Sequence, residues 1–338
     1  MHTAQKTTLI AGAGGFIGGH LVGELLRDEH ADVRAVDIRS PEEWQQCFSG
    51  AENVQLDLSD LEACREAVAG ADRVYNLAAD MGGVGYLTSH RARCMLSVLI
   101  NTNLLRAAHG EGVNRFFFSS SACVYPTLRQ TSAALEPLRE DDVMPALPDG
   151  AYGWEKLFSE QMCQEFSADM ALPTRVARLH NAYGPRGTYR GGREKAPAAI
   201  CRKVAEAELS GSGEIEIWGD GEQTRSFMYV DDCIEGIRRI MDSDVSRPLN
   251  LGSSELVTLN QLVDLVEEAA GIELHRRYDT SAPVGVRGRN SDNTLIRAQL
   301  GWEPSVSLRD GIARTYAWVR ARVGEESLRL SRPAGPSP

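Results

Sequence analysis

The sequence predicts an α/β protein with a doubly wound parallel sheet and a smaller C-terminal α/β domain. Short apolar strands alternate with helical segments along the first half of the chain, which is the pattern of a parallel sheet with crossover helices. A glycine-rich turn directly follows the first of these strands. The length of 338 residues is sufficient for one large unit of this kind and a second, smaller domain.

The first predicted unit is a strand, a glycine turn, a helix and a second strand. The apolar strand Thr8–Ala11 leads into Gly12–Gly18, and the second strand ends in Asp37. Glycines in such a turn let the backbone approach a pyrophosphate, and a carboxylate at this distance accepts from a ribose hydroxyl, as in a Rossmann-type dinucleotide site. Asp37 favours NAD over NADP because its carboxylate repels a 2′-phosphate. Arg39 lies nearby in the sequence, so NADP stays an alternative cofactor. The expected cofactor contacts here are Gly12, Gly15, Phe16, Ile17, Gly18, Asp37, Asp57 and Leu58.

Further strands and helices extend this unit. The third strand ends at Asp57, Val74–Ala78 is the fourth, and Arg115–Ser119 follows a helix through Asn101. The expected domains are residues 1–184 with a returning segment at about 225–258, which bind NAD, and residues 185–224 and 259–325, which bind the substrate. Residues 326–338 are expected to form a disordered tail, because they become rich in proline and polar residues.

Charge and composition exclude several classes of protein. The net charge is −11, whereas nucleic acids and anionic membranes are bound by basic surfaces, so neither is an expected partner. No apolar run approaches the roughly 18 residues of a membrane span, and the N-terminus lacks the pattern of a signal peptide. The seven cysteines are scattered without a CxxC pair, which predicts reduced thiols in a cytoplasmic protein and no metal site.

Tyr152 and Lys156 form the candidate redox pair. Residues four apart lie on one face of a helix, where an ammonium is expected to lower the pKa of the phenol. The phenolate can then take a proton from a sugar hydroxyl, and Ser121 on the preceding strand can hydrogen-bond the same oxygen. Lys156 is also expected to contact the nicotinamide ribose. The YxxxK spacing alone is common by chance, but it follows a serine-rich strand in a dinucleotide fold.

Cys123 and Lys195 are the candidates for a second proton transfer, at carbon. Most cysteines are inert buried thiols, but Cys123 lies just beyond the strand end that carries Ser121. The chain has only four lysines, and a lysine can shift its pKa and hand over a proton, whereas arginine effectively cannot. Lys195 lies between glycines and a helix start, which suits a loop closing over a substrate. An added acid–base pair indicates an epimerase rather than a plain dehydrogenase.

Three cations in separate segments are candidates for binding an anionic ligand. An acidic protein that binds such a ligand needs locally concentrated positive charge, and Lys203, Arg225 and Arg289 can supply it if their segments converge. Gln223 follows a turn that starts at Trp218. We expect this tryptophan to pack in the core rather than to meet a ligand.

Several long blocks together resemble the GDP-mannose 3,5-epimerase family, a member of the extended short-chain dehydrogenase/reductases. The resemblance covers the chain from about Thr8 to Arg322. The blocks that carry it are Asn76–Gly83, Ser120–Pro126, Ala151–Gly153 with Lys156, His180–Pro185, Gly191–Pro197, Trp218–Ser226 and Val286–Asp292.

The resemblance implies a role for each matching residue. Tyr152, Lys156 and Ser121 are implied in oxidation and reduction, and Cys123 and Lys195 in epimerisation. It also implies a homodimer formed through the helices that follow Gly85 and Tyr152. The implied nucleotide-sugar contacts are Gly82, Gly83, Ser121, Cys123, Asn181, Glu194, Lys195, Ala196, Lys203, Gln223, Arg225 and Arg289.

The implied reaction is NAD-dependent 3,5-epimerisation of GDP-mannose or a related nucleotide sugar. Transient oxidation at C4 acidifies the hydrogens at C3 and C5, and reduction then restores C4. A 4-epimerase needs no cysteine–lysine pair, and a 4,6-dehydratase usually carries an acid/base pair such as Asp-Glu in place of Ala122-Cys123. A non-catalytic NAD-binding regulator is the alternative of another class, and it predicts loss of Tyr152, Lys156 or Cys123.

Overall fold

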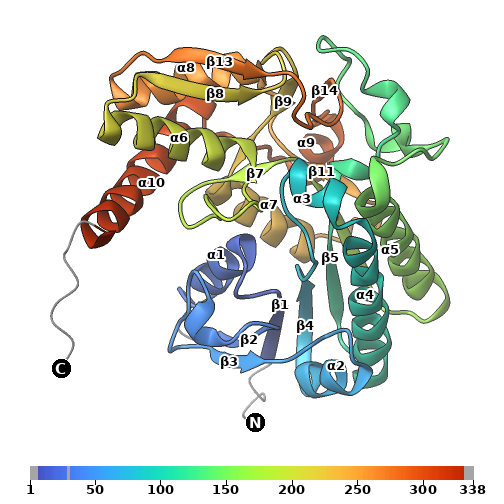
Figure 1. The fold of residues 1–338 in the computed structure, drawn as a ribbon. Coiled ribbons are helices and arrows are strands. Elements are labelled where there is room, and N and C mark those ends of the chain that lie inside the picture. Colours follow the sequence, from blue (N-terminus) through green and yellow to red (C-terminus); the bar gives the residue numbers. More distant parts are fainter. Residues whose placement is uncertain (1–6, 29–30, 331–338) are drawn as a thin grey trace, which may run out of the picture.

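The computed structural model describes residues 7–28 and 31–330, and its centre is a seven-stranded parallel sheet (Figure 1). The strands are β1 (Thr7–Ala11), β2 (Asp32–Asp37), β3 (Glu52–Gln55), β4 (Ala71–Asn76), β5 (Arg115–Ser121), β6 (Thr174–Leu179) and β11 (Leu249–Leu251). Their order is β11-β6-β5-β4-β1-β2-β3, and each neighbouring pair is parallel. Because the order runs outward from β1 in both directions, the sheet is doubly wound, and the predicted fold class is confirmed.

Helices cover both faces of this sheet. They are α1 (Phe16–Leu25) and α7 (Val230–Asp242) on one face, and α2 (Leu61–Val68), α4 (Arg91–Glu111) and α5 (Gly150–Asp169) on the other. Side chains of β5 alternate between the two cores: Phe117 packs with α1 and α7, whereas Phe116 and Phe118 pack with α2, α4 and α5. Successive side chains of a strand point to opposite faces of the sheet. Because helices cover both faces, apolar residues follow one another along the strand.

The second part of the chain lies above the main sheet in Figure 1. It contains a parallel pair, β8 with β13, and a three-stranded sheet in the order β12-β9-β14. Its three longest helices, α6, α8 and α10, pack against one another. The elements are α6 (Ala196–Ser210), β8 (Glu214–Trp218), β9 (Thr224–Ser226), β12 (Leu256–Thr258), α8 (Leu259–Ala270), β13 (His275–Asp279), β14 (Gly288–Arg289) and α10 (Leu308–Leu330).

Shorter elements complete the chain. The parallel pair β7 and β10 follows the main sheet, and α3 follows β4. These elements are α3 (Val84–Ser89), β7 (Ala182–Tyr183), β10 (Met228–Tyr229), α9 (Thr294–Leu300) and the 3-10 helices Pro41–Glu43, Ala122–Val124, Thr127–Arg129 and Glu140–Val143.

The carboxyl ends of the central strands carry the polar residues of the candidate site. Segment 80–83 follows β4, Ser121 ends β5, and Asn181 follows β6. In open α/β sheets, ligands bind in the crevice outside these strand ends. The fold therefore brings the predicted motifs together at one edge of the sheet.

The sequence predicts that the disordered tail begins at residue 326, but the structure shows residues 326–330 in a helix. Helix α10 continues to Leu330, and Glu326 accepts a hydrogen bond from the Tyr189 hydroxyl at 2.6 Å. The same carboxylate pairs with Arg190 at 3.2 Å. These contacts hold residues 326–330 in the helix, whereas residues 331–338 lie outside the described residues. The other expected domain boundaries stay a prediction.

In the described part of the chain, no helix is long and apolar enough to cross a membrane. Across the same residues, no three His, Cys, Asp or Glu side chains are grouped so that they can hold a metal ion. All seven cysteines are free thiols, and Cys47 is the exposed one.

Candidate active site

The glycine turn after β1 fits the diphosphate of a dinucleotide. Gly12 has a φ of +83°, and an added Cβ would lie 2.8 Å from the backbone that follows β4. An added Cβ on Gly18 would overlap the carbonyl oxygen of Gly12. Helix α1 begins at Phe16 with Gly15 as its N-cap, so the first N–H groups, including that of Ile17, have no partner within the helix. A tight turn at a helix N-terminus is a ready site for a phosphate anion.

Two acidic residues mark the end of the crevice beside β2 and β3. Asp37 ends β2 and accepts hydrogen bonds from the backbone and side-chain nitrogens of Arg39 at 3.0 and 3.2 Å. Arg39, which left NADP open, therefore pairs with the residue that favours NAD. Asp57 accepts from the backbone of Ser59 at 2.9 Å, and Leu58 beside it is buried. These side chains fit the adenosine half of NAD, in which a carboxylate accepts from ribose hydroxyls.

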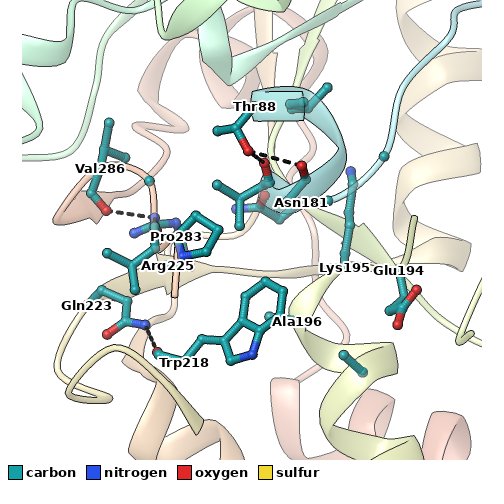
Figure 2. A pocket seen from close by; sticks show the side chains of 18 of the residues that line it. Thr88, Asn181, Glu194, Lys195, Ala196, Trp218, Gln223, Arg225, Pro283 and Val286 are labelled. Carbon is teal, nitrogen blue, oxygen red and sulfur yellow. Dashed lines mark hydrogen bonds between the residues drawn. The ribbon is translucent and has the colours of Figure 1, made fainter. Parts of the chain in front are cut away.

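A cavity of about 480 Å³ lies at the carboxyl ends of β4, β5 and β6, beneath the second part of the chain. The predicted substrate contacts that line it are Gly82, Gly83, Ser121, Cys123, Asn181, Glu194, Lys195, Ala196, Lys203, Gln223, Arg225 and Arg289. Tyr152 lines it as well. In Figure 2, Lys195 and Glu194 lie on one side of the cavity and Arg225 on the other. The roles of these residues stay proposals, but the structure places all of them in one cavity.

Tyr152 and Lys156 are both buried on α5, and their electrostatics differ from the expectation. Burial raises the pKa of Tyr152 above its usual value of 10, and Cys123 and Glu155 raise it further. A hydrogen bond with Ser121 acts in the opposite direction. The Lys156 ammonium lies 5.5 Å from the centre of the Tyr152 ring and 3.7 Å from the Glu155 carboxylate. The expected lowering of the phenol pKa is therefore wrong for this structure, because burial of the phenol is the largest effect and raises its pKa.

Cys123 meets a fixed cation. Its sulfur accepts a hydrogen bond from Arg289 Nη1 at 3.3 Å. Arg289 is held by Gln130, through Nε at 2.6 Å, and by Asp149, through Nη2 at 2.8 Å. Only a thiolate sulfur can take a proton from carbon, and here a preorganised guanidinium lies beside the sulfur as the counter-charge for that form. Neither Asp149 nor Gln130 stands in a motif, so sequence reasoning missed both.

Lys195 is the N-cap residue of α6 and extends into the cavity (Figure 2). Burial lowers the pKa of Lys195 from its usual value, and Arg289 lowers it too, whereas Cys123 and Cys233 act in the opposite direction. Among the described residues, no hydrogen bond or ion pair holds its ammonium, so its proton is available to a ligand. A lysine with a lowered pKa is a suitable proton donor near neutral pH.

The three cations Lys203, Arg225 and Arg289 come from separate segments and line the same cavity. Arg225 on β9 and Arg289 on β14 are directly paired across two parallel strands. Burial lowers the pKa of Arg225 to about 10, and the charge of Arg289 contributes. Lys203 donates to the carbonyl of Glu216 at 2.8 Å. Asp149 pairs with Arg289, whereas Arg225 donates only to backbone carbonyls among the described residues, so Arg225 favours an anionic ligand that compensates its charge.

The tryptophan of the second part does not pack in the core as expected. Trp218 is 42% exposed and lines the cavity, and its backbone carbonyl accepts from Gln223 at 2.8 Å. The Lys203 ammonium lies 5.8 Å from the centre of its ring. Other lining residues that the sequence analysis did not single out include Met81, Leu87, Thr88, Arg91, Pro283 and Val284. They lie in segments that only the fold brings together.

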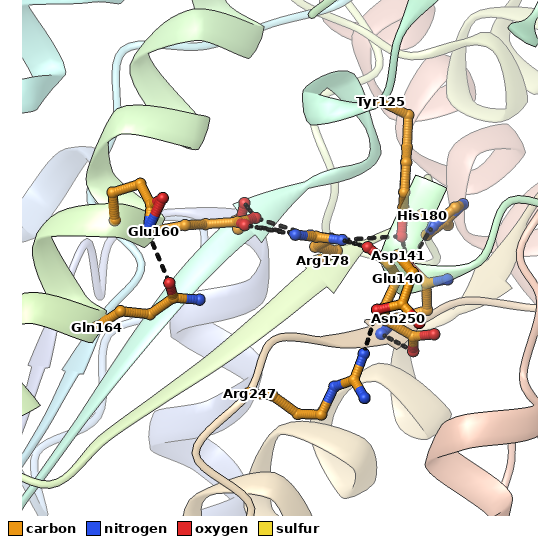
Figure 3. Close-up of polar contacts among 11 residues, drawn as sticks. Tyr125, Glu140, Asp141, Glu160, Gln164, Arg178, His180, Arg247 and Asn250 are labelled. Carbon is orange, nitrogen blue, oxygen red and sulfur yellow. Dashed lines mark hydrogen bonds and ion pairs between the residues drawn. The ribbon is translucent and has the colours of Figure 1, made fainter. Parts of the chain in front are cut away.

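A buried polar network supports the turn that carries Ser121 and Cys123 (Figure 3). Arg178 on β6 forms a two-point ion pair with Glu160, at 2.7 and 3.0 Å. The same guanidinium donates to the Tyr125 hydroxyl at 3.2 Å, and Ser120 donates to Glu160. Ser120 and Tyr125 flank this turn, so the network fixes it at both ends. A buried hydrogen-bonded network of this kind favours one conformation of the turn.

His180 belongs to this network and gives a prediction for acid stability. It is fully buried, and burial is the main cause that lowers its pKa to about 3 from its usual 6.5. The folded state therefore holds a neutral ring, whereas the unfolded state binds a proton below about pH 6.5. Stability is present above that pH and is lost as the pH falls, by about 1.4 kcal/mol per unit for this group. Urea unfolding at about pH 7 and about pH 5 measures this slope.

The matched variant is His180→Gln, which has no titrating group. We expect its unfolding free energy to fall less between the two pH values than that of the wild type, by about 2 kcal/mol. Equal slopes in the two proteins would contradict the assignment.

Comparisons with known proteins place this geometry in context. A model of the "NAD dependent epimerase/dehydratase family" matches residues 8–252. GDP-mannose 3,5-epimerase 1 of Oryza sativa subsp. japonica is 43% identical over 318 residues, which are 94% of this chain and 82% of the relative. GDP-mannose 3,5-epimerase of Arabidopsis thaliana is 41% identical over 325 residues, which are 95% of this chain and 84% of the relative.

Solved structures share the whole architecture. UDP-glucose 4-epimerase of Thermotoga maritima, solved with UDP-glucose, has a TM-score of 0.85 at 27% identity and covers 94% of this chain and 99% of its own. MoeE5, solved in complex with UDP-glucuronic acid and NAD, has a TM-score of 0.79 at 29% identity and covers the same shares of the two chains.

Proposed function

Because this chain belongs to the NAD-dependent epimerase/dehydratase family, we propose that it catalyses the 3,5-epimerisation of GDP-mannose. The products are GDP-L-galactose, GDP-L-gulose or both. The observation that carries the proposal is that Cys123 and Lys195 line the same cavity as Tyr152. A cavity with both a redox tyrosine and a second acid–base pair suits inversion at carbons next to a transient ketone.

In the proposed mechanism, NAD supplies the hydride acceptor for C4 of the sugar. Tyr152 takes the proton of the C4 hydroxyl, and with loss of the C4 hydride, which bound NAD would accept, the product is a 4-keto sugar. Ser121 and Tyr152 then hydrogen-bond the C4 oxygen, which becomes an enolate oxyanion when a proton leaves C5 or C3. One such contact is typically worth about 2.7–4 kcal/mol.

Cys123 and Lys195 invert the carbons in this scheme. Cys123 removes a proton from one face of the keto sugar, and Lys195 delivers a proton to the other. Each positioned proton transfer contributes about 10²–10⁴-fold. Arg289 stabilises the charge on the sulfur. Tyr152 returns the proton to the C4 oxygen as the hydride returns to C4 from bound NAD, so the net reaction is an isomerisation.

The cations of the second part support a nucleotide sugar as the ligand. Arg225 and Arg289 lie side by side on paired strands, and Lys203 lines the same cavity. We assign them to the anionic nucleotide portion, together with Gln223. Gly82, Gly83, Asn181, Glu194 and Ala196 complete the proposed contacts.

Two sister reactions and one other class remain as alternatives. A 4-epimerase does not need Cys123 or Lys195, and a 4,6-dehydratase usually has an acid/base pair where this chain has Ala122-Cys123. A non-catalytic NAD-binding regulator has no need for the complete set of Tyr152, Lys156 and Cys123. The 3,5-epimerase accounts for all of these residues.

Incubation with GDP-mannose in deuterium oxide tests the proposal. We expect deuterium at C5, or at both C3 and C5, together with new L-hexose signals in the NMR spectrum. Inversion at C4 alone, or loss of water, would assign one of the sister reactions. Binding of NAD without any turnover of GDP-mannose or other nucleotide sugars would assign the regulator.

We also propose a homodimer formed through α4 and α5. These helices pack against each other, and their outer surfaces expose Met95, Leu96, Leu99, Trp154 and Phe158 by between 44% and 59%. Large apolar side chains gathered on two adjacent helices are typical of an interface. A molar mass from light scattering that equals twice that of the chain is the expected result, and a monomeric mass would contradict it.

We place the protein in the cytoplasm, since all of its cysteines are free thiols.

A further inference from the structure

The loop that carries Lys195 contacts the segment after β4 through its backbone. The Gly83 N–H donates to the carbonyl of Arg193 at 3.0 Å. An added Cβ on Gly83 would overlap the carbonyl oxygen of Glu194. The two segments therefore touch directly beside Lys195.

The side chain of Arg193 reinforces this contact. Its guanidinium donates to Asp80 at 2.7 Å and to the Tyr86 hydroxyl at 2.6 Å, and it stacks 3.9 Å from the centre of the Tyr86 ring. The Tyr86 hydroxyl in turn donates to Asp80 at 2.8 Å. Arg93 on α4 pairs with the other oxygen of Asp80 at 3.2 Å. We call Arg193, Asp80 and Tyr86 the loop clamp.

The loop is held at its start by the ion pairs of Arg190 and at its end by helix α6, and the glycines between these points leave its middle to the clamp. Gly191 and Gly192 are exposed and have φ values of +94° and +83°. Within the described residues, no side-chain partner holds the Lys195 ammonium. Its position therefore depends on its own backbone, which follows Arg193 by two residues. A shift of about 1 Å in a catalytic group can cost about 10²-fold in rate.

We propose that Arg193 is a positioning residue, which through the loop clamp holds Lys195 in place for proton delivery to the sugar carbon. The inference rests on the proposed function. Tyr152 packs in the same cluster as Tyr86 of the loop clamp, but among the described residues no hydrogen bond or ion pair joins Arg193 to Tyr152 or Lys156 on α5. Arg193 therefore governs proton transfer at carbon but not hydride transfer at C4.

The test is Arg193→Met, assayed in deuterium oxide with NAD and GDP-mannose. Two quantities are measured: the absorbance of reduced nicotinamide, which reports C4 oxidation, and the rate of deuterium incorporation at C5. We expect incorporation to fall by about 10²-fold, with C4 oxidation changed by less than about threefold. Arg193→Lys, which keeps a charge near Asp80, is expected to recover part of the exchange.

Arg190→Met is the matched control on the same loop. Arg190 pairs with Glu206 and Glu326, away from the loop clamp, so both rates should stay as in the wild type. Tyr86→Phe repeats the test with a smaller change, since it removes only the hydroxyl that accepts from Arg193.

The outcomes separate the inference from the proposed function. If the wild type itself incorporates no deuterium at C3 or C5, the proposed function fails. If the wild type exchanges and Arg193→Met and Tyr86→Phe exchange equally fast, the inference is overturned. A parallel loss of oxidation and exchange in both variants also overturns it, because the residue then supports the site as a whole.

Discussion

Replacing Cys123 by alanine is expected to lower deuterium incorporation at C3 and C5 by about 10²–10⁴-fold, while C4 oxidation persists. The variant removes the proposed base for carbon but leaves Tyr152, Lys156 and Ser121 in place. The 4-keto sugar can therefore still form, with its C3 and C5 hydrogens acidified but without a group to remove them. Single-turnover absorbance of reduced nicotinamide and NMR of the sugar measure the two steps separately.

Cys94→Ala is the control for this variant. Cys94 on α4 is a buried thiol that packs in the same apolar cluster as Cys123 and Tyr152, but it does not line the cavity. We expect both rates in this variant to remain close to the wild type. Full epimerisation by Cys123→Ala, or an equal loss in Cys94→Ala, would contradict the assignment of Cys123 as the base.

The parts of the site that the sequence predicts are those with local spacing. Tyr152 and Lys156 are one helical turn apart, so their common face follows from the geometry of a helix. The glycine intervals of Gly12–Gly18 predict the turn that the structure shows, because only glycine fits its contacts. Cys123 could be placed near Tyr152 because Cys123 follows the end of a strand and Tyr152 lies on the next α-helix.

Long-range pairings could not be predicted in this way. Arg178 on β6 meets Glu160 on α5, 18 residues earlier, and Arg193 meets Asp80, 113 residues earlier, only because the fold packs these elements together. The direction of the Tyr152 pKa could not be predicted either, since burial is its largest cause and Cys123 and Glu155 add to it. A motif gives the residues that meet, but the balance of their charges depends on the whole fold.

Tyr152→Phe is expected to lose both C4 oxidation and deuterium exchange, each by about 10²–10⁴-fold. Phenylalanine keeps the ring that packs on α5 but has no hydroxyl to take the C4 proton. The hydrogens at C3 and C5 become acidic only after C4 is a ketone, so exchange must fail with oxidation. This joint loss distinguishes Tyr152 from Cys123, whose removal is expected to stop exchange alone.

Tyr75→Phe provides the matched control, because Tyr75 on β4 is a buried tyrosine outside the cavity. Its variant should retain both rates. Stopped-flow absorbance and deuterium NMR on the three proteins give the comparison. If Tyr152→Phe still exchanged deuterium at C5, carbon acidity would not depend on oxidation by this residue, and the order of steps in the mechanism would be wrong. If it lost exchange but kept oxidation, Tyr152 would act with Cys123 at carbon, and another group would have to take the C4 proton.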